Sequence, residues 1–363
     1  MFELQQIVEP LLKWYDGSHR ILPWRESPTP YHVWISEIML QQTRVEAVKP
    51  YYDRFLRALP DIASLAAVDD EELLKLWEGL GYYNRARNLK KAAIQIQTEY
   101  GGQMPGEYEE LMKLSGIGSY TAGAIGSIAF HRPVPAVDGN VLRVIARVSA
   151  DDGDIMDQKV RRLVEERLLG IMPKDRPGDF NQALMELGAV VCIPNGAPHC
   201  EACPWQSFCQ ARLADRIGEY PRKSPKKPRV IEDKTVLLIR DENRTAIRKR
   251  PNKGLLAGMY EFPMLEGHKE EKEVLEYVKG LGYGVIYIKE LEPSKHIFTH
   301  REWHMTGYLI RVDELERPEV PGQEGMIFAE RDQAQERYPM PAAFARYTAY
   351  LKIRLGNDRF REE

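Results

Sequence analysis

The stretch that constrains this chain most runs from residue 111 to residue 140, LMKLSGIGSYTAGAIGSIAFHRPVPAVDGN. It predicts a short helix, a tight turn containing Gly116 and Gly118, and a second helix rich in Ala, Gly and Ile. Two glycines let the backbone of the turn approach another molecule closely, and the second helix begins with unpaired N–H groups. Because these donors and the positive end of the helix dipole point the same way, the motif predicts a phosphate-binding turn.

A carboxylate follows this turn, in the segment PAVDGN, which delivers Asp138 to the start of an apolar-periodic helix over 141–148. Taken alone, Asp138 is most simply an N-cap, since an Asp before a helix accepts hydrogen bonds from orphan N–H groups. A Gly-x-Gly turn between helices is equally weak evidence by itself. A phosphate-binding turn and a carboxylate in one segment together favour chemistry on nucleic acid.

Length, composition and net charge limit the classes of protein to which this chain can belong. The 363 residues are enough for two domains with separate cores, and the contents of 43% hydrophobic and 29% charged residues are typical of soluble proteins. The chain has no apolar run of about 18 residues and its start, MFELQQIVEP, lacks a basic region, so we expect a cytoplasmic protein. The net charge of −3 predicts no strong non-specific binding of polyanions, so any DNA contact must be local and use backbone donors.

Residues 31–42, YHVWISEIMLQQ, are predicted to form a buried helix in which Val33, Glu37 and Leu40 share one stripe. A lone carboxylate on such a stripe is costly unless it is paired, and burial raises its pKa toward that of a useful general acid. The alternative is that Glu37 turns outward or caps a loop. The amides that follow, Gln42 among them, suit base edges or a gap in a base stack.

Two other segments combine aromatic and cationic side chains. The stretch LPWR is expected to be non-helical and sets Trp24 beside Arg25, either as a loop anchor or facing a substrate. The turn EGLGYYNR over 78–85 offers glycines, two tyrosines and nearby cations, which suit base stacking and phosphate contact. A helix C-cap followed by a solvated helix face explains the same residues equally well.

All four cysteines lie in one short loop with the spacing C-x7-C-x2-C-x5-C. In a chain without a secretion signal this clustering favours metal ligation over disulfides. Zinc sites more often use two C-x2-C pairs and only one is present, so the spacing favours an iron–sulfur cluster, with a mixed zinc site using His199 as the alternative. The four predicted ligands are Cys192, Cys200, Cys203 and Cys209.

Periodicity divides the chain into two parts. The first part is predicted to be all-α, with no strand before residue 230, and its clearest helices cover 3–15, 31–42, 141–149, 158–171 and 178–191. The segment PRKSPKKPRV, residues 221–230, has three prolines and five cations and is predicted to be an extended basic linker. The second part is predicted to be α+β, with a hairpin over 235–249, strands near 284–290 and 303–311, a loop over 295–300, and helices over 268–280 and 342–355.

Several of these motifs resemble one family. LSGIGSYTAG followed by VPAVDGNV resembles the helix-hairpin-helix and Gly/Pro…Asp motif of the endonuclease III superfamily of DNA glycosylases, and the cysteine loop resembles its 4Fe–4S loop. LPWR, SEIMLQQTRV and WEGLGYYNRARN narrow the resemblance to A/G-specific adenine glycosylases of the MutY type, over nearly the whole chain. The resemblance implies a helical glycosylase domain over 1–220 (hairpin about 107–130, cluster loop 192–209), the linker 221–230, and a Nudix-like domain recognising 8-oxoguanine over 231–363.

The resemblance implies a monomeric base excision repair enzyme that hydrolyses the N-glycosidic bond of adenine opposite 8-oxoguanine or guanine in duplex DNA. Glu37 would be the general acid and Asp138 would stabilise an oxocarbenium-like sugar, with Tyr120 and Asn140 in support. The implied substrate contacts are Trp24, Arg25, Leu40, Thr43 and Gln182 around the base, Gln42 and Tyr82 in the disturbed stack, Phe298, Thr299 and His300 at 8-oxoguanine, and Gly116 and Gly118 at the DNA backbone.

Departures from related families refine the reaction. Tyr120 stands where lyase members of the superfamily carry a Schiff-base lysine, which implies a monofunctional glycosylase, although Lys113 just before the turn leaves a weak lyase activity open. After GLLAGMYEFP the chain lacks the REUxEExGU pattern (U being aliphatic) that holds magnesium in Nudix hydrolases, so hydrolysis there is not expected. The alternatives are an endonuclease III-like glycosylase/lyase for oxidised pyrimidines and a non-catalytic sensor of DNA damage.

Overall fold

The computed structural model describes residues 2–225, 227–315 and 325–360, which form two compact units. The first unit comprises Met1–Tyr52, Leu59–Ala67 and Asn88–Lys226, and the second comprises Asp53–Ala58, Val68–Arg87 and Lys227–Glu363. The boundary between Lys226 and Lys227, where the first unit ends, therefore lies inside the predicted linker. The second unit also gathers two helical segments from the first part of the chain, which no sequence pattern indicates.

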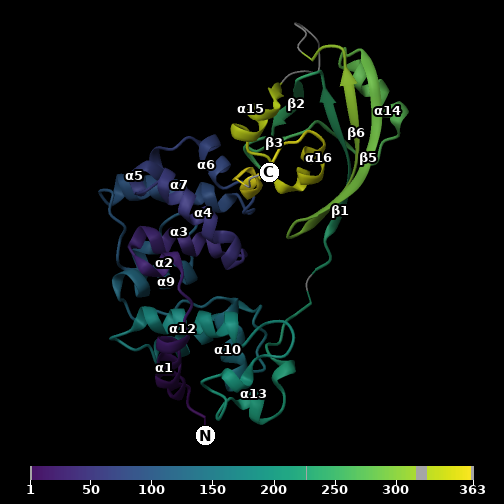
Figure 1. The fold of residues 1–363 in the computed structure, drawn as a ribbon. Coiled ribbons are helices and arrows are strands. Elements are labelled where there is room, and N and C mark those ends of the chain that lie inside the picture. The colour runs from purple at the N-terminus through teal and green to yellow at the C-terminus, as the bar shows by residue number, and fades with distance from the viewer. Residues whose placement is uncertain (1, 226, 316–324, 361–363) are drawn as a thin grey trace. The chain divides into compact units, whose positions relative to one another are not determined.

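The first unit is helical (Figure 1), and no strand among the described residues precedes Val230, as predicted. Its helices, two of them shared with the second unit, are α1 (Val8–Ser18), α2 (Pro23–Glu26), α3 (Pro30–Leu40), α4 (Val45–Ala58), α5 (Ile62–Ala67), α7 (Asn84–Glu99), α8 (Tyr108–Leu111), α9 (Ser119–Phe130), α10 (Gly139–Ser149), α11 (Gln158–Leu169), α12 (Pro177–Val190) and α13 (Gln210–Leu213).

Most predicted helices of this unit are confirmed to within a few residues. The stretch LPWR is an exception, because it forms the one-turn helix α2 rather than a non-helical segment. Pro23 occupies the first helical position, where its fixed φ and missing N–H cost nothing.

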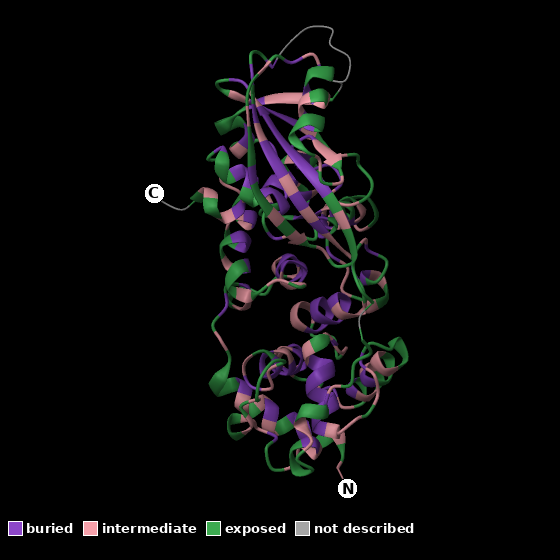
Figure 2. Cartoon of the chain, turned by 90° about the vertical axis from the view of Figure 1, so that its right-hand side faces the viewer, coloured by how far each residue is buried: buried purple, intermediate pink, exposed green. Residues whose placement is uncertain are grey.

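The core of the first unit lies where α1, α10 and α12 pack together, while α3 packs on α9 and α9 also on α12. Its fully buried residues include Leu11 from α1, Ile145 from α10, and Leu184 and Leu187 from α12. In α1 the buried residues Val8, Leu11 and Tyr15 recur three and four positions apart, so this helix buries one face, whereas every residue of α10 from Val141 to Val148 is buried (Figure 2).

A close backbone contact fixes the segment that leads to α10. A Cβ atom on Gly123, in the middle of α9, would come within 2.0 Å of the carbonyl oxygen of Pro135. Only glycine permits this approach, because no side chain stands between the helix and the segment. Gly123 therefore sets the position of residues 135–138, which end in Asp138.

The second unit contains a seven-stranded sheet with the order β3-β2-β1-β6-β5, to which β4 adds along β1 and β7 along β2. β1 and β6 are parallel, and the other pairs are antiparallel. The strands are β1 (Val230–Arg240), β2 (Arg244–Lys249), β3 (Tyr260–Glu261), β4 (Met264–Glu266), β5 (Val285–Ile297), β6 (Arg301–Val312) and β7 (Met326–Glu330), and the helices are α6 (Asp70–Leu76), α14 (Glu271–Gly280), α15 (Arg331–Glu336) and α16 (Ala345–Tyr350).

Helices cover both faces of the sheet. In β1, Val236 and Leu238 pack in the cluster that contains α16, whereas Leu237 and Ile239 pack in the cluster that contains α14. This alternation follows from the period of two in a strand. The predicted α+β character is confirmed, and the buried strand residues stand out in Figure 2.

Two expectations for this unit are corrected. β5 continues to Ile297, so only residues 298–300 form the connection to β6, instead of the predicted loop over 295–300. The predicted helix over 342–355 consists of a 3-10 turn and the short helix α16, because Lys352 adopts a φ of +56° that a helix cannot continue.

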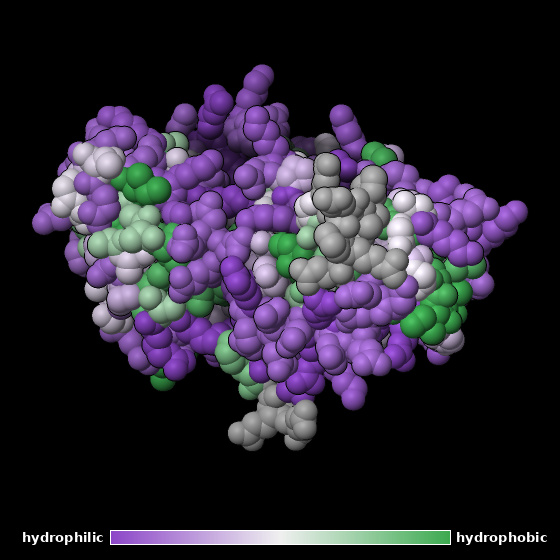
Figure 3. Space-filling view, turned by 90° about the horizontal axis from the view of Figure 1, so that it is seen from above, coloured by the Kyte–Doolittle hydropathy of each residue, from purple (hydrophilic) through white to green (hydrophobic). Residues whose placement is uncertain are grey.

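None of the described helices combines the length and apolar character needed to cross a bilayer. In the view of Figure 3, hydrophilic side chains dominate and hydrophobic ones form small separate groups.

The contact at Gly123 predicts a large difference between two glycine substitutions in helices. Gly123→Ala should lower the free energy of unfolding by about 1–3 kcal/mol, because the new methyl group forces α9 and the 135–138 segment apart. Gly17→Ala is the matched control, since a Cβ on Gly17 in α1 meets no atom within 4 Å, and it should stabilise by about 0.5–1 kcal/mol. Chemical unfolding of both variants measures the effect, and equal stabilities would contradict it.

Candidate active site

A cleft of about 880 Å³ in the first unit gathers most of the predicted site residues. Its walls come from α2, α3, α9, α12 and the segment before α10. The predicted residues on these walls are Trp24, Arg25, Glu37, Leu40, Gln42, Thr43, Tyr120, Asp138, Asn140 and Gln182. Residues separated by more than 150 positions in sequence thus line one space.

Glu37 is buried on α3, with only 6% of its surface exposed, so the alternative in which it turns outward is wrong. Its carboxylate accepts a hydrogen bond from the hydroxyl of Tyr120 on α9, which also approaches the sulfur of Met185 at 3.2 Å. Trp24 closes the cleft nearby, held edge-on against Tyr52 at 5.5 Å between ring centroids.

Asp138 is the N-cap of α10, as one interpretation of the sequence predicts. Its Oδ1 accepts from the backbone N–H of Val141 at 2.8 Å, and its Oδ2 accepts from Nδ2 of Asn140 at 2.7 Å. The carboxylate nevertheless lines the cleft, so the capping role fixes its orientation there without removing it from the site.

The two carboxyl groups have different electrostatic environments. Burial raises the pKa of Glu37 to about 7, and Asp138 adds to this shift, against the hydrogen bond from Tyr120 and the charge of Arg25. Burial also raises the pKa of Asp138 above its usual value, although bonds from Val141 and Asn140 oppose it. Near neutral pH the carboxyl group of Glu37 is therefore about half protonated, and the carboxyl group of Asp138, whose pKa is also raised, lines the same cleft.

The predicted phosphate-binding turn connects α8 to α9. Gly116 has a φ of +77°, and a Cβ there would come within 2.6 Å of the Cβ of Asn88, so glycine is required on both grounds. Gly118 is the N-cap of α9 in extended conformation, and a Cβ on it would meet no atom within 4 Å. The N–H groups that begin α9 are thus approachable past Gly118.

Lysine is absent from the walls of the cleft in the described part of the chain. Lys113 lies before the turn, where its Nζ pairs with Glu110 at 2.6 Å and its side chain is 62% exposed.

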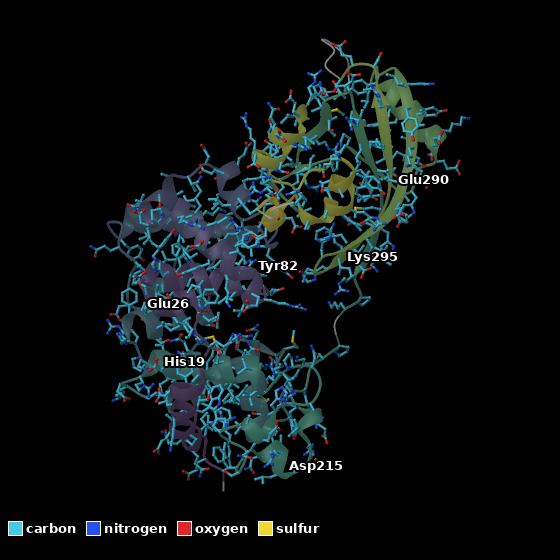
Figure 4. The ribbon with its side chains drawn as sticks, in the orientation of Figure 1. His19, Glu26, Tyr82, Asp215, Glu290 and Lys295 are labelled. Atoms are coloured by element: carbon cyan, nitrogen blue, oxygen red, sulfur yellow. The ribbon has the colours of Figure 1, made fainter. Side chains whose placement is uncertain are left out.

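The other predicted substrate contacts lie in the second unit. Tyr82, labelled in Figure 4, follows the glycine turn after α6 with a φ of +48°, and 46% of its surface is exposed. The guanidinium of Arg85 lies 5.5 Å from its ring centroid.

The connection between β5 and β6 presents Phe298, Thr299 and His300. The ring of Phe298 packs edge-on against His296 at 4.6 Å and Trp303 at 5.0 Å, whereas Thr299 and His300 are exposed. The aromatic side chain therefore anchors a turn whose tip is open to solvent.

The four cysteines line one largely apolar cavity beside α10 and α12. No three Cys, His, Asp or Glu side chains in the described ranges converge closely enough to hold a single metal ion. Nη1 of Arg147 lies 3.3 Å from the sulfur of Cys192 at the wall of this cavity. The four cysteine side chains thus share one cavity.

Sequence reasoning missed two arginine networks. Arg143 donates from Nε to the carbonyl oxygen of Cys192 at 2.9 Å and from Nη2 to Oδ1 of Asn140 at 2.9 Å, so it links the cysteine loop to the residue that holds Asp138. Arg25 pairs with Glu186 on α12. Arg143 and Glu186 are charged residues within largely apolar helices, and the same sequence feature indicated Glu37. This feature could have marked the two residues as buried, although it does not reveal their partners.

Comparisons with known proteins identify the families to which the two parts of the chain are similar. Residues 35–169 match the HhH-GPD superfamily base excision DNA repair protein family, and residues 235–350 match the NUDIX domain. A solved structure of a trapped endonuclease III–DNA covalent intermediate has a TM-score of 0.50 and 28% identity, covering 61% of this chain and 100% of that chain.

Curated relatives are similar over most of the chain. The adenine DNA glycosylase of Mus musculus is 34% identical over 409 residues, covering 96% of this chain and 79% of the mouse protein. The adenine DNA glycosylase of Buchnera aphidicola subsp. Acyrthosiphon pisum is 35% identical over 303 residues, covering 83% of this chain and 85% of that protein. Because both relatives match across most of their own length as well, this chain belongs to the adenine DNA glycosylase family.

Proposed function

We propose that this protein removes adenine from mispairs with 8-oxoguanine or guanine in duplex DNA by hydrolysing the N-glycosidic bond. The observation that carries the proposal is the pair of carboxyl groups in one cleft, Glu37 with a pKa of about 7 and Asp138 beside it. Cleavage of a glycosidic bond needs one protonated and one ionised carboxyl group, and we assign the first role to Glu37 and the second to Asp138, which accepts hydrogen bonds from Asn140 and Val141.

In the proposed reaction adenine leaves the base stack and enters the cleft. Glu37 donates its proton to a ring nitrogen of adenine, the bond between C1′ and the base breaks, and both bonding electrons leave with adenine. The ionised Asp138, held by Asn140 and the N–H of Val141, stabilises the positive sugar. Water then adds its oxygen to C1′ and returns a proton to Glu37, so the product is an abasic site and free adenine.

The proposed reaction is monofunctional. Tyr120 occupies the position beside Glu37, and Lys113 is engaged with Glu110, so the cleft offers water rather than an amine as the nucleophile. A lyase activity requires an amine that forms a Schiff base with C1′.

The second unit is assigned to recognition of the opposite base. The exposed tip at Thr299 and His300 offers a hydroxyl and an imidazole to a flat heterocycle, and Phe298 anchors the tip. Tyr82 and Gln42 are assigned to the gap that the extruded adenine leaves, since an exposed aromatic ring and an amide both stack on bases. The N–H groups near Gly116 and Gly118 are assigned to a DNA phosphate.

The cysteine loop is assigned to a 4Fe–4S cluster held by Cys192, Cys200, Cys203 and Cys209. When bound, the cluster supplies iron–thiolate bonds that cross-link the loop. Arg143 and Arg147 tie this loop to α10, whose N-cap is Asp138. An ordered loop therefore supports the orientation of the catalytic carboxylate through Asn140.

Replacing Glu37 tests the general acid. In single-turnover reactions with a duplex containing one A:8-oxoguanine pair, Glu37→Gln should slow adenine release about 100-fold or more, because the amide cannot donate the proton. Binding of the mispair should persist. Glu26→Gln, an exposed carboxylate on the neighbouring α2 (labelled in Figure 4), is the matched control and should excise at the wild-type rate.

The same assay separates the alternatives. Duplexes with A:G, C:8-oxoguanine and T:G pairs are run beside it, and strands should break only at adenine and only after alkali. Strand breakage without alkali would favour the alternative of a glycosylase/lyase. Tight binding of the mispair without release of the base would favour the alternative of a non-catalytic sensor of DNA damage. An undiminished rate in Glu37→Gln would reject Glu37 as the acid.

The raised pKa of Glu37 predicts the pH dependence of the chemical step. The acid form is required, so the single-turnover rate should fall about tenfold per pH unit once the pH exceeds about 7. The residual rate of Glu37→Gln should stay flat over the same range. A wild-type rate that is constant to pH values well above 7 contradicts the assignment.

Metal analysis tests the cysteine loop. The purified protein should contain about four iron and four acid-labile sulfide per chain. Cys203→Ala should lose most of both and melt at a lower temperature, because loop order depends on the bonds to the cluster. Ser207→Ala, an exposed position in the same loop, is the control and should keep the iron. Zinc without sulfide, or full iron content in Cys203→Ala, would overturn the assignment.

A further inference from the structure

The proposed reaction does not use the carboxylate of Glu186, although this group lines the same cleft. Glu186 lies on α12 with 0% of its surface exposed. Its Oε1 accepts from the backbone N and from Nε of Arg20 at 3.1 and 2.6 Å, and its Oε2 accepts from Nη2 of Arg20 at 3.0 Å and Nη2 of Arg25 at 2.8 Å. Both oxygens are thus fully engaged (Figure 4 labels His19, which precedes Arg20 in the sequence).

Arg25 is held from several sides. Besides its bond to Glu186, its Nη1 donates to the carbonyl oxygen of Arg20 at 3.0 Å, and its guanidinium lies 5.7 Å from the ring centroid of Tyr15. Its side chain is only 15% exposed, yet it lines the cleft with Glu37. These two hydrogen bonds leave other N–H donors of the Arg25 guanidinium for a further acceptor.

The charges explain why the carboxylate stays ionised. Burial would raise the pKa of Glu186, but the hydrogen bonds from Arg20 and the charge of Arg25 outweigh it and hold that pKa below its ordinary value. Two guanidinium groups share one carboxylate, so one positive charge remains at the wall of the cleft. A buried carboxylate is tolerated only with such partners, and removing it leaves the arginines without a fixed anchor.

We propose that Glu186 is a positioning residue that holds the guanidinium of Arg25 at the wall of the base pocket, ready to donate to a ring nitrogen of the extruded base. This inference rests on the proposed excision of adenine, whose ring nitrogens accept hydrogen bonds. An arginine on a flexible chain loses rotational freedom when it binds, and the hydrogen bond that Arg25 donates to Glu186, together with its contact with the ring of Tyr15, imposes that restriction before the base arrives.

A double-mutant cycle tests the coupling. Arg25→Ala and Glu186→Ala should each slow single-turnover excision about tenfold or more, and the double variant should be no more than about twofold slower than the slower single variant. Glu261→Ala is the matched control, because Glu261 is a carboxylate 3% exposed that Arg248 and Arg250 clamp in the second unit. It should melt at a lower temperature, excise at the wild-type rate, and combine additively with Arg25→Ala.

A pH profile adds a readout that a merely structural role would not move. Glu37 is faced by Tyr120 from α9, Asp138 before α10 and Arg25 from α2. The other charged residues lining the cleft are Arg20, Arg44, Arg161 and Glu186. Glu186→Gln keeps an acceptor for Arg25 but removes the negative charge that balances it. The stronger positive field should favour the carboxylate of Glu37, so the alkaline fall of the rate should move to lower pH by about 0.3–1 unit.

The outcomes are distinct. Additive effects of Arg25→Ala and Glu186→Ala, or an unmoved alkaline limb in Glu186→Gln, would overturn the positioning role while adenine excision by the wild type still stands. If the wild type releases no adenine, the proposed function fails first and the positioning role fails with it.

Discussion

The burial of the carboxyl group of Glu37 is the constraint on which the rest of the site depends. α3 is buried along nearly its whole length, from Tyr31 to Met39, because α9 packs against it and supplies Tyr120. A carboxylate in such a helix would cost several kcal/mol if it stayed charged without partners. Burial therefore raises the pKa of Glu37 to about 7, so the packing that stabilises the helical unit also gives this carboxyl group a pKa that suits the proposed proton donor.

The position of the second carboxylate, that of Asp138, is determined by backbone contacts rather than by apolar burial alone. Gly123 admits the carbonyl of Pro135 against α9, and the chain then turns into α10 with Asp138 as its cap. The same bonds that begin the helix hold the carboxylate toward the cleft. The helix cap and the proposed catalytic carboxylate are therefore one group, and any change that displaces the cap also displaces this carboxylate from the cleft.

Local pattern was enough to predict the helical elements, the hairpin, the buried acid and the cysteine loop, because each depends on residues close in sequence. The pairing of Glu186 with Arg20 and Arg25 was out of reach, since it joins positions more than 160 residues apart. The same holds for Glu78, a fully buried carboxylate that accepts from the backbone N–H groups of Met340 and Gly356. Such contacts place residues 68–87 in the second unit. No periodic pattern in the sequence predicts these contacts.

The near balance of 51 basic and 54 acidic residues is a mild argument against a DNA partner. A sum of charges over the whole chain, however, does not distinguish buried charges from those on the surface. Several arginines serve the interior: Arg143 and Arg147 bind carbonyl groups of the cysteine loop, and Arg25 is clamped by Glu186. These cations add to the formal charge without reaching a phosphate. Binding must then come from uncharged donors, such as the N–H groups that begin α9, and from the basic residues of 221–230. Contacts to the DNA backbone position a protein on the duplex and carry no sequence information, so discrimination of the mispair falls to the groups that meet the two bases.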